Sequence, residues 1–309
     1  MGHDAVVMAG VDGSAPSLHA LDWAAAHAAK VGWRLHIVCA YALPTFAAAS
    51  LDGGYATLDD AAIRDGAQAV LDEALARVDD IGVPVTSALE TGDPAGVLVE
   101  ASRDVCLAVV GTRGRSGFAE RILGTVSSAL PAHAHCPTVV VPYKDGAELP
   151  IPITRIVVGV DGSPSAKGAL KRAIEEAELW GAELTAVTGI PIGTGTGLLG
   201  WLPTSVDSET LLADCKAGLD VTVDRALEGH DITVRRHALD GTGAALLAEF
   251  STAVDLVVVG TRGRGGFAGM LLGSTSQALL HHSACPIMVV PSRTQDEGLP
   301  PIAPWSAAG

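Results

Sequence analysis

The sequence predicts an α/β protein with two tandem domains, each built on a five-stranded parallel sheet with helices on both faces. Three observations support this fold class. The chain has 309 residues, which is more than one domain usually holds. The segment "VVMAGVDGSAPSLHAL", which begins at Val6, returns as "RIVVGVDGSPSAKGAL" at Arg155, 149 residues later. Short apolar runs alternate with amphipathic stretches in both halves, which is typical of parallel sheets buried on both faces.

The first copy opens with a strand, a helix and a second strand. Residues 5–11 form an apolar run that predicts a buried strand. A helix is expected from about Pro16 to Val31, because Ser14 is a suitable N-cap and Gly32 a suitable terminator. The run "RLHIVCAY", residues 34–41, predicts the second strand.

The alternation continues to the end of the first copy. Residues 58–78 carry apolar side chains at helical spacing, so one face of this helix is expected to pack on the sheet. The remaining elements expected are, in order, a strand (83–89), a short helix (93–102), a strand (106–111), a helix after Gly124 and a strand (138–142).

A constant offset places the second copy and sets the domain limits. Asp12 recurs as Asp161 and Cys136 as Cys285, both at 149 residues. Charge, glycine and proline interrupt the pattern at the seam "YKDGAELPIPITR", residues 143–155. We therefore expect domain one at residues 1–146, domain two at residues 147–294 and a C-terminal tail at residues 295–309.

Two stretches do not fit the repeated pattern. "GIPIGTGTGLLGWLPTS", residues 189–205, has the glycines of a phosphate loop, but no helix begins directly after it. We expect a mobile flap there, with ligand contact as the alternative. The tail is rich in proline, which opposes helix and sheet, so it should be poorly ordered or extended.

Composition and charge narrow the function classes. Hydrophobic residues make up 48% of the chain, which fits well-buried α/β domains. The net charge of -15 argues against nucleic-acid binding, because phosphate neutralisation needs a basic surface. No apolar run approaches the roughly 18 residues of a membrane span, and the N-terminus lacks a signal-peptide pattern. The five cysteines are isolated, which indicates free thiols in a reducing compartment rather than a disulfide framework or a metal site. We therefore expect a cytoplasmic protein.

The most specific motif follows the fourth strand of each copy. It reads "GTRGRSGFAERILGTVS" at residues 111–127 and "GTRGRGGFAGMLLGSTS" at residues 260–276. The carboxyl ends of parallel strands border the ligand crevice of an open sheet. Gly111 and Gly114 there can take positive φ angles and let an anion approach backbone N–H groups. The alternative is a tight turn with solvated arginines.

The helix that follows each motif adds to this interpretation. Its first turn offers free N–H groups, the positive end of the helix dipole and hydroxyl groups, all suited to phosphate, and the loop arginines can pair with phosphate oxygens. The candidate phosphate-binding residues are Gly111, Arg113, Gly114, Gly124, Thr125, Val126 and Ser127 in the first copy, and Gly260, Arg262, Gly263, Gly273, Ser274, Thr275 and Ser276 in the second.

Asp12 and Asp161 directly follow the first strand of each copy and should face the same crevices. Phosphate would repel a carboxylate, so these side chains are better suited to accept hydrogen bonds from a ribose hydroxyl or a base amino group, or to hold a metal through water. The alternative is helix capping, for which Ser14 and Ser163 are also available.

Together these residues resemble the universal stress protein family in its tandem two-domain form. The family pattern G-x2-G-x9-G-[ST] begins at Gly111 and again at Gly260, and "VDGS" after the first strand and "CP" before the fifth also match. The resemblance covers roughly residues 5–142 and 154–291. It implies two Rossmann-like domains of the adenine nucleotide alpha hydrolase-like type, paired through their last strands as an intrachain pseudo-dimer that can form homo-oligomers.

The same resemblance implies a ligand. ATP, with Mg²⁺, would occupy each crevice, with Asp12 and Asp161 near the base and ribose and the backbone around Ala40 and Gly189 reading adenine. Two departures between the copies predict unequal affinities for the nucleotide. Pro131 stands where Leu280 stands, and should kink or shorten its helix. Arg121 is likewise replaced by Met270.

The sequence favours a regulatory protein over a dedicated enzyme. It has no P-loop and no H-E-x-x-H zinc motif, and Ser14 and Ser163 lack a recognisable base, so no catalytic residue is expected. The leading hypothesis is an ATP-binding stress-response sensor. The alternatives are an interaction scaffold with degenerate or cyclic-AMP-binding pockets, and a slow ATPase.

Overall fold

The computed structural model describes residues 5–42, 60–112, 114, 123–192, 208–264 and 271–292. Arg113, Arg121 and Met270, named above, lie outside these ranges, and so does the motif arginine Arg115. Residues 193–205 of the expected flap and the tail lie outside them as well. In the described part the first copy consists of β1 (Val6–Val11), α1 (Ala15–Val31), β2 (Arg34–Tyr41), α2 (Asp60–Arg77), β3 (Val85–Thr91), α3 (Pro94–Ala101), β4 (Leu107–Gly111), α4 (Thr125–His133) and β5 (Thr138–Val141). The second consists of β6 (Arg155–Gly159), α5 (Pro164–Trp180), β7 (Glu183–Ile190), α6 (Ser208–Ala226), β8 (Val234–Asp240), α7 (Gly243–Phe250), β9 (Leu256–Gly260), α8 (Ser274–His282) and β10 (Ile287–Val290).

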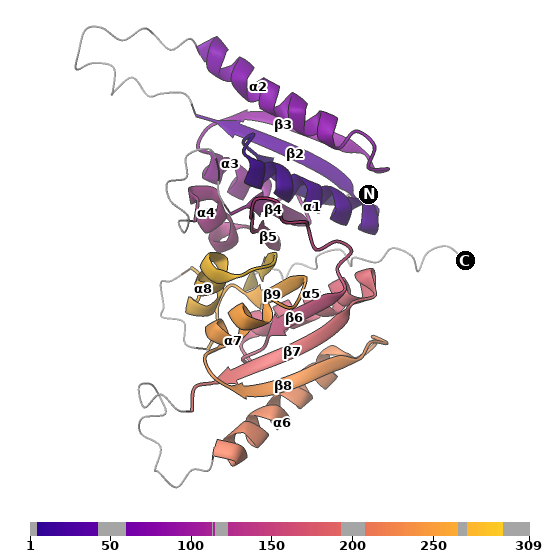
Figure 1. The fold of residues 1–309 in the computed structure, drawn as a ribbon, viewed down its shortest axis with the longest axis vertical. Helices are drawn as coiled ribbons and strands as arrows, with labels where there is room; N and C mark the ends of the chain where they lie inside the picture. Colours follow the sequence, from indigo (N-terminus) through magenta and orange to yellow (C-terminus); the bar gives the residue numbers. More distant parts are fainter. Residues whose placement is uncertain are drawn as a thin grey trace, which may run out of the picture.

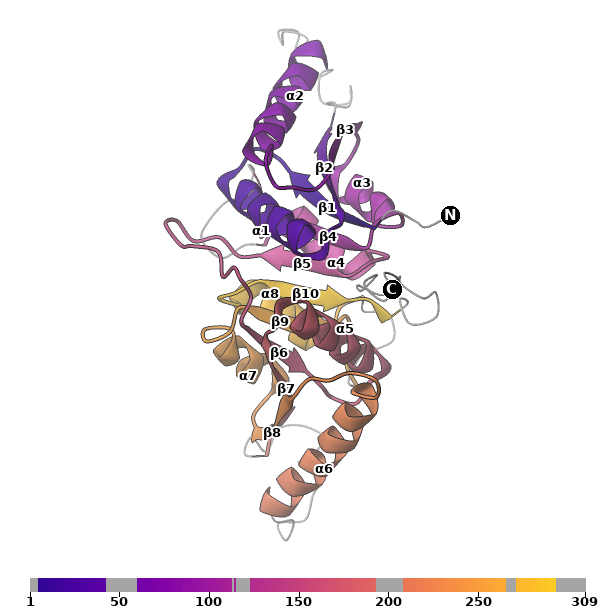
Figure 2. The same cartoon turned by 90° about the vertical axis from the view of Figure 1, so that its right-hand side faces the viewer.

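All of these strands join one ten-stranded sheet in the order β3-β2-β1-β4-β5-β10-β9-β6-β7-β8. Each half is parallel within itself, which confirms the expected α/β fold class. The halves meet where β5 and β10 run antiparallel side by side (Figures 1 and 2), with Val139 opposite Met288. The expected pairing through the last strands is therefore confirmed, and neither apolar strand is left as a bare edge.

The core consists of two layers, one on each face of the sheet. Alternate residues of β1 point to opposite faces, so Val7 and Ala9 lie in one layer and Met8 in the other. The first layer packs under α1, α2, α5 and α6, and the second under α3, α4, α7 and α8. Both layers contain residues from both copies, so each layer is continuous across the two halves.

Local signals placed most helix ends correctly. Ser14 caps α1 by accepting a hydrogen bond from the Ser17 N–H at 3.3 Å, and Gly32 ends the helix with a φ of 72°. The third strand begins later than expected, at Val85 rather than residue 83. Pro84 stands directly before it and has no N–H to donate to the ladder of this edge strand.

The expectation that Pro131 shortens its helix is wrong. Both α4 and α8 have nine residues. Proline removes a single backbone hydrogen bond, and the buried Pro131 ring occupies the place that Leu280 fills in the second copy. Packing against the sheet therefore holds both helices to the same length.

Charged side chains connect α1 with α5 across the junction of the two halves. His27 Nε2 lies 3.1 Å from both carboxylate oxygens of Glu176, and Arg172 Nη2 lies 2.9 Å from Glu176 Oε1. His27 stacks on Trp23 with ring centroids 5.2 Å apart. The His27 and Glu176 side chains are fully buried. They are also equivalent residues of the two copies, since they stand 149 positions apart.

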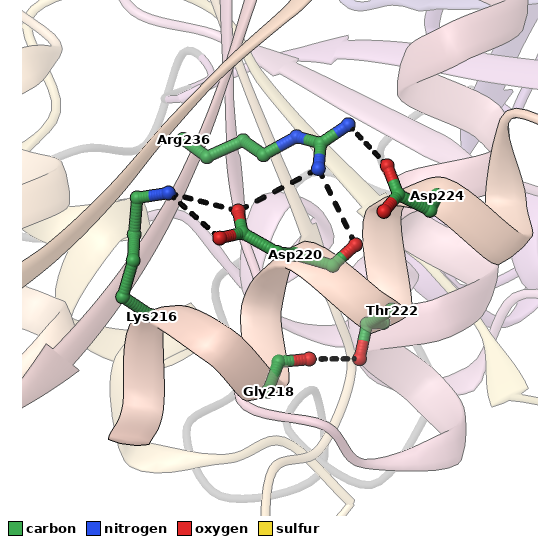
Figure 3. A network of polar contacts seen from close by, with 6 residues as sticks. All are labelled: Lys216, Gly218, Asp220, Thr222, Asp224 and Arg236. Carbon is green, nitrogen blue, oxygen red and sulfur yellow. Dashed lines mark hydrogen bonds and ion pairs between the residues drawn. The ribbon is translucent and has the colours of Figure 1, made fainter. Parts of the chain in front are cut away.

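Two further polar contacts hold the second copy together. Asp255 Oδ2 accepts hydrogen bonds from the Thr154 N–H at 2.8 Å and the Arg155 N–H at 2.9 Å, which attaches the end of the seam to the sheet. Figure 3 shows how Arg236 of β8 reaches α6, with Nη2 2.6 Å from Asp224 Oδ1 and Nη1 3.5 Å from Asp220 Oδ1. Among the described residues, no helix combines the length and apolar character needed to cross a bilayer.

Candidate functional site

A cavity of about 400 Å³ lies at the carboxyl ends of β1, β2 and β4. It is at the point where the chain order reverses, because β1 has β2 on one side and β4 on the other. The walls include every predicted residue of the first copy that the structure describes: Asp12, Ala40, Gly111, Gly114, Gly124, Thr125, Val126 and Ser127. Arg113 lies outside the described residues.

The second copy has the equivalent cavity, of about 310 Å³. All its predicted residues line the cavity: Asp161, Gly189, Gly260, Arg262, Gly263, Gly273, Ser274, Thr275 and Ser276. The fold thus brings together residues that the sequence separates by more than a hundred positions. We refer to these cavities as the first and second crevice.

The helices α4 and α8 point uncapped N-termini at these crevices. Their N-caps are Gly124 and Gly273, in extended conformation, and neither receives a side-chain capping hydrogen bond. The four other helices whose N-caps fall in the described ranges all have one, from Ser14, Asp93, Ser163 and Thr242. First-turn N–H groups left without a capping side chain, together with the helix dipole, form an anion-binding site.

Serine hydroxyls hold each of these helices to the preceding loop. Ser127 Oγ donates to the Thr112 carbonyl at 2.7 Å, and Ser276 Oγ donates to the Gly260 carbonyl at 2.7 Å. Both side chains are buried. The sequence predicts that the Ser127 hydroxyl contacts the ligand, but its proton is donated to the Thr112 carbonyl of the loop. The backbone N–H groups of the first turn are therefore the better candidates for anion contact.

The motif glycines are needed for close approach rather than for the positive φ angles that glycine permits. Neither Gly111 nor Gly114 is among the glycines with positive φ. A Cβ on Gly111 would lie 2.5 Å from the Pro16 carbonyl oxygen, and one on Gly114 would clash with Asp12 Oδ2. These glycines let the motif loop pack directly on the turn between β1 and α1. That turn contains the left-handed residue, Gly13, with a φ of 79°.

The two aspartates organise this turn while lining the crevices. Asp12 Oδ1 accepts hydrogen bonds from the Ser14 N–H at 3.0 Å and hydroxyl at 2.6 Å. Asp161 Oδ1 accepts from the Ser163 N–H at 2.9 Å, and its Oδ2 accepts from the Arg264 N–H at 2.8 Å. Ser14 and Ser163 cap the helices, as the sequence allowed. Each carboxylate thus has a defined orientation at the crevice wall.

Sequence reasoning missed the contribution of α3 and α7. Asp93 and Leu98 line the first crevice, and Gly243 and Leu247 line the second. The available signal was the turn after the third strand, where Gly92 and its counterpart precede the two N-caps. The two crevices also differ at one described position, because Asp93 lines the first and Thr242 is its equivalent in the second copy.

Cysteine and metal chemistry receive no support from the described residues. All five cysteines are free thiols, as the sequence predicted. Burial raises the pKa of Cys136 and of Cys285 to about 12, so neither is a nucleophile near neutral pH. Within the described ranges, no group of three or more His, Cys, Asp or Glu side chains could hold a metal ion.

Comparisons with known proteins agree with this architecture. The model of the Universal stress protein family matches residues 5–142 and 152–291. The universal stress protein Rv2005c of Mycobacterium tuberculosis is 36% identical over 214 residues, which cover 68% of this chain and 70% of that one. The universal stress protein Rv2623 of the same organism is 33% identical over 235 residues, covering 73% and 76%. A crystal structure of a universal stress protein from Archaeoglobus fulgidus has the same fold, with a TM-score of 0.68 at 22% identity over 93% of this chain and 98% of that one. With both halves matched by the family model and arranged in one sheet, the chain belongs to the universal stress protein family as a tandem two-domain member.

Proposed function

We propose that each crevice binds an adenine nucleotide, ATP with Mg²⁺, and that the protein acts as a nucleotide-dependent regulator in a stress response. One observation carries the proposal. The N-termini of α4 and α8 line the crevices, and among the described N-caps theirs are the two without a capping side chain, which leaves first-turn N–H groups to a ligand.

The crevice residues suit the parts of a nucleotide in different ways. The phosphates fit the first turns of α4 and α8, where backbone N–H groups lack a capping acceptor and can donate to phosphate oxygens. Asp12 and Asp161, on the turns that follow β1 and β6, are acceptors for ribose hydroxyls or the base amino group. Ala40 and Gly189 are the penultimate residues of β2 and β7, and their backbone groups would contact the adenine ring. Mg²⁺ would be held mainly by the phosphates and water, as it commonly is.

Binding without turnover fits the chemistry of the described crevices. The lining residues include no pair of nucleophile and general base: the serines donate to backbone carbonyls, and Asp12 accepts from Ser14. A bound nucleotide would instead join the motif loop, the β1–α1 turn and the start of α3 or α7. Occupancy would therefore stabilise one arrangement of these segments, which is the property a regulator needs.

The test fills the anion site without disturbing the fold. In the double variant Gly124→Asp with Gly273→Asp, the new carboxylates would cap α4 and α8 and stand where phosphate should bind. The backbone at both N-caps is extended and suits aspartate. A Cβ on Gly273 would meet its nearest neighbour at 3.4 Å, which is an ordinary contact. Alanine at Gly111 and Gly260 would be a poorer test, because it clashes with α1 or α5.

A matched control changes the charge equally elsewhere. Gly66→Asp with Gly218→Asp places two carboxylates on exposed helix positions with open space around them. Calorimetric titration with MgATP should show binding to wild type and control and none to the Gly124→Asp, Gly273→Asp variant, whose Tm should not fall. Undiminished MgATP binding by that variant would contradict the proposal. Tight binding of cyclic AMP in place of ATP, or no nucleotide binding by the wild type, would favour the alternative of an interaction scaffold.

A further inference from the structure

A third cavity, of about 740 Å³, lies outside both crevices, between α5 and α6 of the second copy. We name it the α5–α6 groove. Lys167 and Lys171 lie on its α5 side, and Val221 and Arg225 on its α6 side. In Figure 2, α5 lies beside the β5–β10 junction and α6 extends away from it. The groove therefore begins close to the junction and opens on the outside of the molecule.

Three cations of this groove form no ion pair with a described side chain. Within the described ranges, no carboxylate lies within ion-pair distance of Lys167, Lys171 or Arg225, and all three are exposed. The acids that flank Arg225 on α6 are already engaged: Asp220 pairs with Lys216 and Arg236, and Asp224 pairs with Arg236 (Figure 3).

The remaining charges of the groove do not cancel these cations. Glu175 and Glu228 also line it. Burial raises the pKa of Glu175, which disfavours its negatively charged form. Arg172, only 4% exposed, pairs with Glu176 but leaves its Nε without a hydrogen-bond partner. The groove is thus locally basic in a protein whose net charge is -15.

The first copy shows that this basic groove is not a general property of the fold. There, Arg77 of α2 donates to both carboxylate oxygens of Asp22 on α1, at 2.6 and 2.7 Å, and bridges the two helices. At the equivalent positions, 149 residues on, the second copy has Ala226 and Lys171. The bridge is lost, the small side chain leaves room, and a lysine replaces the acid. The groove therefore lies where the first copy has the bridge between its two helices.

An apolar residue stands among these cations. Val221 is 59% exposed, and its equivalent in the first copy is Asp72. A small inorganic anion would make no favourable contact with the apolar Val221 side chain. Protein interfaces, in contrast, combine apolar contacts with charged rims. We propose that the α5–α6 groove binds an acidic peptide segment of a partner protein, with its carboxylates on Lys167, Lys171 and Arg225 and an apolar side chain on Val221.

The position of the groove places such a partner next to the second crevice. Ala166 lines the crevice and Lys167, the next residue of α5, lines the groove. Val290 of β10 lines the groove and pairs in register with Gly260 of the motif. The proposal does not depend on nucleotide binding, because Lys167, Lys171 and Arg225 line neither crevice.

The experiment measures binding of a fluorescein-labelled octapeptide of alternating glutamate and leucine to the full chain by fluorescence anisotropy. The test variant is Lys167→Glu with Lys171→Glu and Arg225→Glu. The control, Arg64→Glu with Arg103→Glu and Lys144→Glu, makes the same charge change at exposed positions away from the groove. A third variant, Val221→Ser, removes the apolar contact. All substituted side chains are exposed, so thermal unfolding should confirm intact folding.

We expect the peptide to bind wild type and control alike, and to bind the triple groove variant at least tenfold more weakly, which equals about 1.4 kcal/mol. Affinity should fall with added salt, and Val221→Ser should weaken it further at fixed salt. Three results would overturn the proposal. They are no binding to wild type, equal losses in the groove and control variants, and binding of inorganic tripolyphosphate at the groove in place of the peptide.

Discussion

Replacing Glu176 with glutamine removes one negative charge from the junction of α1 and α5 while keeping the shape of the side chain. In the wild type, Glu176 lies 3.1 Å from His27 Nε2 and 2.9 Å from Arg172 Nη2, with all three side chains buried. Burial by itself raises the pKa of Glu176, but the charges of His27 and Arg172 and the hydrogen bond from His27 outweigh it and lower the pKa to about 2. The variant leaves Arg172 buried without its nearest acid.

The expected loss of stability is about 3 kcal/mol. The pKa of Glu176 falls from 4.5 to about 2, and a tenfold change in proton affinity equals about 1.4 kcal/mol, which gives roughly 3 kcal/mol. Removing one partner of a buried ion pair typically costs about 3–5 kcal/mol, in agreement with this figure. Since 1 kcal/mol moves the Tm of a domain of about 150–250 residues by about 2–4 °C, the Tm should fall by roughly 6–12 °C at pH 7.

Differential scanning calorimetry of the full chain measures this effect, with Glu175→Gln as the control. Glu175 is the preceding residue of α5 and its Oε2 lies 3.6 Å from Arg172 Nη1. Burial raises the pKa of Glu175, so a neutral glutamine there should leave the Tm unchanged or slightly higher. The reasoning is refuted if Glu176→Gln melts with the wild type, or if Glu175→Gln loses as much.

Three further outcomes are expected. Because the pKa of Glu176 is depressed, its contribution to stability is complete above pH 4.5 and is lost as the pH falls toward about 2. In a pH series, the Tm difference between wild type and Glu176→Gln should therefore shrink over that range. A Tm difference that stays constant would contradict this. MgATP titration should resolve two affinities, since Asp93 lines the first crevice and its equivalent in the second copy is the uncharged Thr242. Gly124→Asp and Gly273→Asp alone should each abolish a different affinity; two equal sites unchanged by either substitution would count against the prediction. Iodoacetamide at pH 8 should label the half-buried Cys106 and Cys215 before Cys136 and Cys285, whose pKa burial raises to about 12, as mapped by peptide mass spectrometry; early labelling of Cys136 would be the opposite result.

The sequence was informative where structure depends on neighbouring residues or on the repeat. Ser14 and Gly32 mark the ends of α1 because capping is a local interaction. The constant offset predicted two domains, and the carboxyl-end position of the motif placed its residues at the crevices. The conformational role of Gly111 was misjudged, because the need for a missing Cβ arises from Pro16, which only the fold brings to that point.

Features that arise between distant helices were not predicted. The α5–α6 groove depends on Ala226 and Lys171 facing each other across two helices, and no periodicity in one segment shows this. The contact of His27 with Glu176 had a usable signal, since the offset of 149 pairs these two residues directly. A basic and an acidic residue at equivalent helix positions indicate a contact between copies once those helices are known to meet.

That equivalence has a consequence for how the halves recognise each other. When two identical domains associate about a twofold axis, a residue near the axis faces its own copy. Two separated first halves would bring His27 against His27, and two second halves would bring Glu176 against Glu176, each leaving like groups buried together. In the tandem chain the junction instead pairs two unlike groups, His27 and Glu176, which complement each other. We therefore expect the first half to associate with the second half more tightly than with another first half. The junction itself thus favours pairing of the two different halves.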